Sequence, residues 1–189
     1  MRKEMNEHEI RQIPLTAILA ASGIILPQFF HMLGIGSTFL PMFLPIVLGS
    51  MLLHWRFALS LAIICPLVSW LLTGMPPMLP PVLPIMLIEL SAMALVISLI
   101  RVHLNKAVWI ALISGILVDR ILLFLIVLAV APLLGFTHPI FSYALVFSGT
   151  PGIVLQLITI PVAMKFIEQK FPQYITEKRD NKWRENDVS

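Results

Sequence analysis

Six apolar segments run along the chain, and short stretches rich in polar residues, glycine or proline separate them. Long uninterrupted apolar runs predict membrane-spanning helices, because about 20 residues of helix cross the hydrocarbon core of a bilayer. We therefore expect an all-α integral membrane protein, built as a compact bundle of six transmembrane helices. The segments cover residues 15–30, 39–53, 57–73, 82–100, 107–134 and 142–167.

Prolines interrupt two parts of this pattern. The second segment begins with FLPMFLP, and Pro41 and Pro45 cannot both lie in one regular helix, because proline lacks a backbone donor. Irregular backbone at membrane depth is tolerated only where protein or a water-filled cavity covers it. The stretch TGMPPMLPPVLP, residues 73–84, is too rich in proline for a helix and predicts a stiff, extended cap between the third and fourth helices.

The composition excludes a soluble protein. Of the 189 residues, 58% are hydrophobic and 12% are charged, whereas soluble domains are about half apolar and about a quarter charged. A soluble helical bundle with these apolar runs would have too little polar surface. The net charge of +3 would suit a nucleic-acid partner, but the placement of the basic residues gives a different explanation.

The basic residues gather on one side of the predicted membrane. Twelve of the thirteen Lys and Arg residues precede the first helix, flank the loops after the second and fourth helices, or follow the sixth. Loops rich in Lys and Arg stay in the cytoplasm, so we expect both termini there and no nucleic-acid partner. The predicted regions are a cytoplasmic segment 1–13, a transmembrane domain 14–168 and a polar cytoplasmic tail 169–189.

Asp119 and Arg120, the thirteenth basic residue, are neighbours near the middle of the fifth helix. An ionisable group at that depth costs about 2.5–3.5 kcal/mol and normally faces the bundle interior or a cavity. Adjacent residues of a helix point about 100° apart. We therefore expect that the two charges do not simply cancel on one face, and that at least one reaches another helix or a solute.

Other polar residues within the membrane segments are candidates to meet this pair. Glu89 lies in the fourth helix and Gln156 in the sixth. His31, near the outer end of the first helix, and His138, in the last outer loop, are placed to line a rim. Helical spacing predicts that a small, polar face of the sixth helix points at protein or a pocket, and this face contains Gly149, Gly152, Gln156, Thr159 and Ala163.

These residues support two interpretations at this point. In the functional one, they line a pocket that is open to the outside and binds a small polar solute. Arg120 then pairs with a solute anion, or its acidic neighbours neutralise it. In the structural one, an ion pair of Arg120 with Glu89 or Asp119 locks the bundle.

The sequence carries no recognisable catalytic motif. A phosphate-binding loop, a metalloprotease His-Glu-x-x-His motif and a serine-nucleophile motif are all missing, and Cys65 is the single cysteine. We therefore assign no catalytic residue, no cofactor and no metal ligand. The inventory favours a binding subunit that takes its energy from another protein.

Three stretches resemble the substrate-binding S components of energy-coupling factor (ECF) transporters, in that family's order: FHMLGIGSTFLPMFLPIVLGS, PLVSWLLTGMPPMLPP and GTPGIVLQLITIPV. The resemblance covers roughly residues 14–165. It implies a six-helix bundle with both termini inside a bacterial cell membrane, and a vitamin or related micronutrient bound near the outer face. It also implies partners, namely a transmembrane coupling subunit and two cytoplasmic ATPases.

The resemblance also bears on two sites. Ala17 and Ala21 of the first helix are small residues four positions apart, which let another helix approach closely or pack within the chain. The resemblance implies that they dock the coupling subunit. Members of the family often read Pro-Met-His-Ile-Pro where this chain has PMFLP, residues 41–45. Phe43 thus removes a polar ring from the predicted pocket, which indicates a more apolar or aromatic solute, or a different one.

Three functions remain as hypotheses. The leading one is the solute-binding subunit of an ATP-driven importer, with binding residues Arg120, Asp119, Glu89, Gln156, Phe43 and His31. The second is a small structural membrane protein of the bacterial rod-shape type, in which the buried charges are internal locks and no solute binds. The third is a small proton-coupled carrier that uses Asp119 as a relay.

Overall fold

The computed structural model describes residues 7–32, 34, 41–78, 81–130 and 149–171, and the regular elements in these ranges are all helical. They are α1 (Glu7–Met32), α3 (Phe43–Leu52), α4 (Trp55–Thr73), α5 (Val82–Ser98), which continues as the π-helix η1 (Leu99–His103), α6 (Val108–Leu125), which continues as the π-helix η2 (Ile126–Val130), and α9 (Thr150–Lys170). Within this part of the chain, five helices are long and apolar enough to cross a membrane, and α3 is a shorter apolar one. The predicted six-helix bundle is therefore confirmed in helix number.

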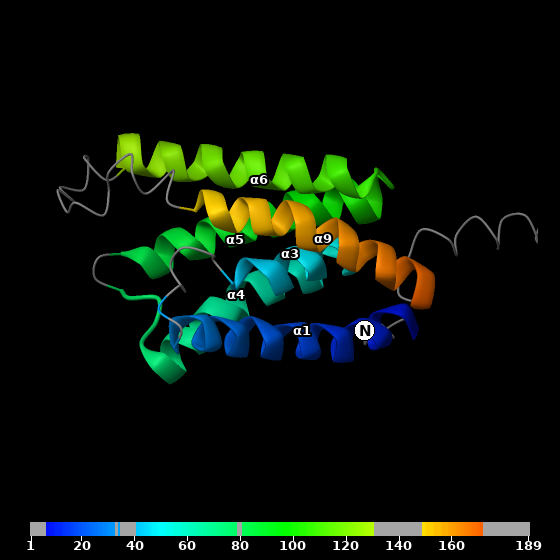
Figure 1. Ribbon diagram of the computed structural model, residues 1–189, viewed down its shortest axis with the longest axis horizontal. Coiled ribbons are helices and arrows are strands. Elements are labelled where there is room, and N and C mark those ends of the chain that lie inside the picture. Colours follow the sequence, from blue (N-terminus) through cyan, green and yellow to red (C-terminus); the bar gives the residue numbers. More distant parts are fainter. Residues whose placement is uncertain (1–6, 33, 35–40, 79–80, 131–148, 172–189) are drawn as a thin grey trace, which may run out of the picture.

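The helices lie side by side, with the beginning of α1 and the end of α9 at the same end of the bundle (Figure 1). The turn between α3 and α4 and the turn between η1 and α6 also lie at this end, because hydrogen bonds and an ion pair join them to α1 and α9. We call it the basic end, because Arg56, Arg101, Lys106 and Lys170 belong to it. The opposite end is the distal end. Residues 1–6 and 172–189 of the predicted cytoplasmic segments lie outside the described residues.

Three of the helices have a proline in their first turn. Pro45 is the third residue of α3, Pro84 the third of α5 and Pro151 the second of α9. Backbone N–H groups in the first turn of a helix have no intrahelical acceptor, so a proline there removes nothing. Pro41 precedes α3, which confirms that Pro41 and Pro45 do not share one helix.

The proline-rich connection between α4 and α5 is shorter than the sequence predicts. Gly74 follows α4 with a φ of 72°, the left-handed conformation that commonly ends a helix. α5 then begins at Val82. The expectation of a non-helical cap over residues 73–84 is wrong at both ends. Thr73 is the last residue of α4, and residues 82–84 open α5, because a proline at the third helical position is compatible with the first turn.

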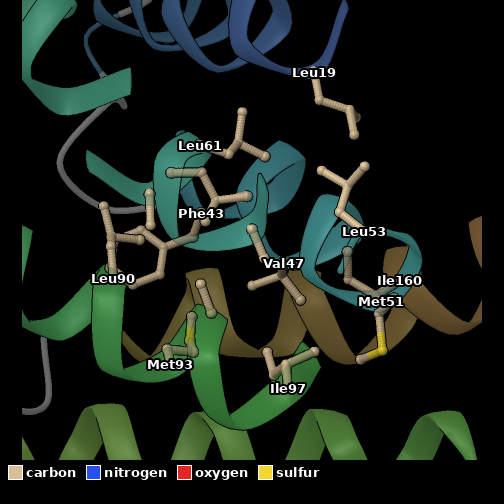
Figure 2. Packing of buried hydrophobic residues seen from close by; sticks show 14 of the residues in the cluster. Leu19, Phe43, Val47, Met51, Leu53, Leu61, Leu90, Met93, Ile97 and Ile160 are labelled. Atoms are coloured by element: carbon tan, nitrogen blue, oxygen red, sulfur yellow. The ribbon is translucent and has the colours of Figure 1, made fainter. Parts of the chain in front are cut away.

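Helix α3 forms the centre of the bundle and packs against α1, α4, α5, α6 and α9. Eight of its ten residues are buried. Figure 2 shows Phe43, Val47 and Met51 of α3 among core residues of the neighbouring helices, which include Leu19, Leu61, Leu90, Met93, Ile97 and Ile160. Ten residues span only about 15 Å, or half of the hydrocarbon core. The chain before α3, Pro41 and Met42, is an irregular but buried turn, so protein covers this backbone as expected.

A buried arginine ties three helices together at the basic end. Arg101, in η1, is only 8% exposed. Its Nη2 donates to Glu168 Oε1 of α9 at 2.8 Å, and its Nη1 donates to the Lys106 carbonyl oxygen before α6 at 3.0 Å. The spacing of the segments predicts Arg101 beside a loop and does not predict its burial. The one signal for it is Glu168, an acidic residue among basic ones at the end of the sixth helix.

Two further hydrogen bonds hold the remaining helices at this end. The His54 N–H, in the turn between α3 and α4, donates to Gln12 Oε1 of α1 at 2.9 Å. Ser98 Oγ of α5 donates to the Leu53 carbonyl oxygen after α3 at 2.8 Å. Because these groups sit where helices end, they satisfy polar atoms that no intrahelical bond reaches. Each described helix is thereby linked to a neighbour at the basic end.

The close approach of α6 to α5 gives a test of this packing. A Cβ atom at Gly115 would overlap Ile97 Cγ1 and Cδ1. We expect Gly115→Val to lower the free energy of unfolding by about 1–3 kcal/mol through overpacking. Since each kcal/mol shifts the midpoint of a chain this size by about 2–4 °C, thermal unfolding in detergent can detect the change. Ile113→Val, at an exposed position of the same helix, is the control, and equal midpoints for the two variants would contradict the packing.

Candidate functional site

Three polar side chains from three helices are buried inside the bundle. Glu89 of α5 is 6% exposed, Asp119 of α6 is 2% exposed and Gln156 of α9 is 2% exposed. Glu89 and Gln156 each lie about 10 Å along their helix from the distal end, at a rise of 1.5 Å per residue. Asp119 lies near the middle of α6 and η2 together. All three face protein rather than lipid, as expected from the sequence.

Arg120 pairs directly with Asp119. Arg120 Nε and Nη2 both donate to Asp119 Oδ2, at 2.9 Å and 2.7 Å. The expectation that these neighbours do not cancel each other is therefore wrong. Their Cα–Cβ bonds diverge, but the long arginine side chain folds back along the helix to reach the carboxylate. Because both residues belong to α6, this pair does not by itself tie α6 to another helix.

Three buried oxygen atoms have no hydrogen-bond partner among the described residues. They are Glu89 Oε1, Asp119 Oδ1 and Gln156 Oε1. Buried polar atoms are paired in the great majority of cases, and leaving one unpaired costs about 1–3 kcal/mol, or more for a charged group. The three atoms are all acceptors, so a molecule with N–H or O–H donors would satisfy them.

The structure brings Glu89 close to the charged pair. Helices α5 and α6 pack along each other, and Glu89 lies within electrostatic reach of both Asp119 and Arg120. Gln156 belongs to α9, which packs against α6 and α3. Glu89, Asp119 and Arg120 together contribute two carboxyl groups and one guanidinium. The guanidinium already pairs with the carboxyl group of Asp119.

The buried face of α9 differs in part from the predicted one. Thr159 is exposed, so its expected position on this face is wrong. The buried positions of the helix and its cap follow the helical period through residues three or four apart, and they are Gly149, Gly152, Gln156, Ile160 and Met164. Gln156 is thus surrounded along its own helix by small and apolar residues.

Of the remaining residues predicted to line the pocket or its rim, the structure describes the side chain of Phe43 but not those of His31 and His138. Phe43, the first residue of α3, is buried in the core cluster together with Leu90, the residue after Glu89 (Figure 2). Its place beside a solute stays a prediction. His31 lies in α1, but its side chain is outside the described part of the structure, and so is the whole of His138.

One comparison with known proteins identifies the family. A family model described as "ECF transporter, substrate-specific component" matches residues 11–166. The chain belongs to this family. No curated protein and no solved structure matches it significantly. As an ECF substrate-specific component, the chain is a multi-pass membrane protein that takes part in substrate transport.

In this ECF component, Ala17 and Ala21 are both exposed on the surface of α1. The alternative that they mediate close packing within the chain is therefore wrong. Larger apolar side chains on the same helix, Ile18 and Ile25, are exposed as well. The pair thus forms a shallow, small-residue strip on an apolar helix surface that the described bundle leaves uncovered.

A double-mutant cycle tests the Asp119–Arg120 pair. We expect Arg120→Gln to lower the free energy of unfolding by about 3–5 kcal/mol, because it leaves the buried Asp119 carboxylate without its partner. Asp119→Asn combined with Arg120→Gln removes both charges and should recover most of that loss. Unfolding of the detergent-solubilised protein measures Arg120→Gln, Asp119→Asn alone and the double variant, which complete the cycle.

The control for this cycle is Arg56→Gln, because Arg56 is exposed at the basic end above the Trp55 ring. Its loss should cost no more than about 1 kcal/mol. If the losses in free energy of unfolding of the two single variants simply add up in the double variant, Asp119 and Arg120 do not stabilise the protein as a pair.

Proposed function

We propose that this protein is the solute-binding subunit of an ATP-driven importer, which binds a vitamin or related micronutrient from outside the cell. It delivers the solute inward together with a transmembrane coupling subunit and two cytoplasmic ATPases. The observation that carries the proposal is the set of buried acceptor oxygens without partners on Glu89, Asp119 and Gln156. A finished structural core would pair such atoms, whereas a solute site leaves them for its solute.

In this proposal the basic end faces the cytoplasm of a bacterial cell, with both chain termini there, because Lys and Arg are retained on that side. The distal end then faces the outside. Glu89 and Gln156 lie closer to the distal end, where an entering solute arrives first. The binding residues are those predicted from the sequence: Arg120, Asp119, Glu89, Gln156, Phe43 and His31.

The exposed strip on α1 supports a docking role for Ala17 and Ala21. Small side chains let two helix backbones approach closely within a membrane, where dispersion contacts and hydrogen bonds replace the hydrophobic effect. A helix of the coupling subunit would lie against this strip. The binding residues named above belong to α3, α5, α6, α9 and the far end of α1, so docking and solute binding use separate parts of the protein.

Co-purification tests the proposed function. A tagged protein extracted in mild detergent should bring down a vitamin-sized compound, the ATPase module, or both. Recovery of cell-wall machinery without any solute would instead support a structural protein of the rod-shape type. Uptake that continues without the ATPases and stops when the proton gradient collapses would support a proton-coupled carrier.

Bulky substitutions on α1 test the docking surface. Ala17→Trp combined with Ala21→Trp should leave solute binding unchanged and reduce ATP-driven uptake by about tenfold or more, because the coupling helix cannot approach. Thr159→Trp combined with Val162→Trp, on the exposed face of α9, is the matched control and should leave uptake close to that of the original protein. Equal uptake by the two double variants would contradict the docking role.

A further inference from the structure

Resting on the proposed solute-binding role, we propose that the solute is an organic cation, and that its positively charged group binds between α5 and α6 against Glu89 and Asp119. Both carboxylates are buried, each keeps one oxygen without a partner among the described residues, and the two residues lie within electrostatic reach of each other. A protonated amine or a protonated ring nitrogen fits these acceptors, because each combines a positive charge with N–H donors.

The balance of charges supports a cation. Two carboxylates and one guanidinium meet at this place, and the Arg120 guanidinium gives two N–H bonds to one oxygen of Asp119. One negative charge therefore remains when both carboxylates are ionised. A buried charge without a counter-charge is costly, and a cationic solute supplies the missing partner.

An anionic solute fits these residues poorly. A solute carboxylate could reach Arg120 only by sharing it with Asp119, and it would then lie close to Glu89 as well. Like charges repel more strongly in apolar surroundings than in water. The paired Asp119–Arg120 group therefore acts against anions, and it helps to select the charge of the solute.

A metal ion also fits poorly. In the described part of the chain, no group of three or more His, Cys, Asp or Glu side chains is placed to hold a metal. Hard cations such as Ca²⁺ take six to eight oxygen ligands, more than two carboxylates and an amide supply. An organic cation needs only a few hydrogen bonds at its charged group. Gln156 can present either its oxygen or its nitrogen, so the charge assignment rests on the two carboxylates.

A charge-sorted extract tests the inference for an organic cation of any structure. A water-soluble yeast extract is separated on ion-exchange resins into cationic, anionic and neutral fractions, and each is added to the purified protein in detergent. We expect the cationic fraction to raise the unfolding temperature by about 5 °C or more at saturation, and the other two to leave it unchanged. Stabilisation by the anionic or the neutral fraction alone would overturn the cation assignment and leave the solute-binding role intact.

If no fraction stabilises the protein, the proposed function fails and the inference fails with it. Glu89→Gln provides the second measurement, because it removes a charge and keeps the shape of the side chain. We expect the amount of cationic fraction for half-maximal stabilisation to rise by about tenfold or more. Glu168→Gln, which alters a carboxylate at the basic end, is the control and should bind as the original protein does.

Two outcomes of the variants decide the role of Glu89. If Glu89→Gln needs the same amount of cationic fraction for half-maximal stabilisation as the original protein, Glu89 does not bind the cation. Glu89→Asp keeps the charge and shortens the side chain, so it should still respond to the cationic fraction alone. A response of Glu89→Asp to the anionic fraction would overturn the inference even if Glu89→Gln cannot be purified in folded form.

Discussion

Hydrocarbon offers no hydrogen bonds, so each polar group that this chain carries into the membrane must find its partner inside the bundle. At the basic end, the chain meets this demand with its own atoms. Arg101 bonds to Glu168 and to a backbone carbonyl, and Ser98 bonds to the backbone after α3. Deeper in the bundle, the demand is met only in part, because oxygens of Glu89 and Asp119 stay unpaired within the described residues. This contrast separates an end whose polar groups are paired from a deeper region that keeps unpaired acceptors.

The Asp119–Arg120 pair explains how one helix carries full charges into the membrane. The pair forms within α6, so the helix neutralises most of its own charge without depending on a neighbour. Because both partners belong to α6, this pair does not by itself link α6 to α5 or α9. Glu89 then contributes a carboxyl group that has no ion-pair partner among the described side chains. The proposed selection of a solute by charge rests on that one carboxyl group.

The sequence predicts the larger features of the fold because they depend on composition and spacing alone. Apolar runs predict the six helices, and Glu89, Asp119 and Gln156 are expected inside because lipid excludes them. The finer features depend on side-chain conformation and local geometry, which spacing does not specify. Arg120 folds back on Asp119 through its own flexible chain, and Arg101 is buried within the π-helical turn η1. Thr159 is exposed because the buried face of α9 continues through Ile160.

Access to Glu89 from outside the cell is the most direct test of the central claim that its carboxylate faces a solute. In a Cys65→Ala background, Glu89→Cys would be exposed to a cationic, membrane-impermeant thiol reagent added to intact cells. The account predicts that the reagent modifies position 89. Leu90→Cys, at a core position that is fully buried, should stay unmodified. Failure of external reagent to reach position 89 would contradict the account.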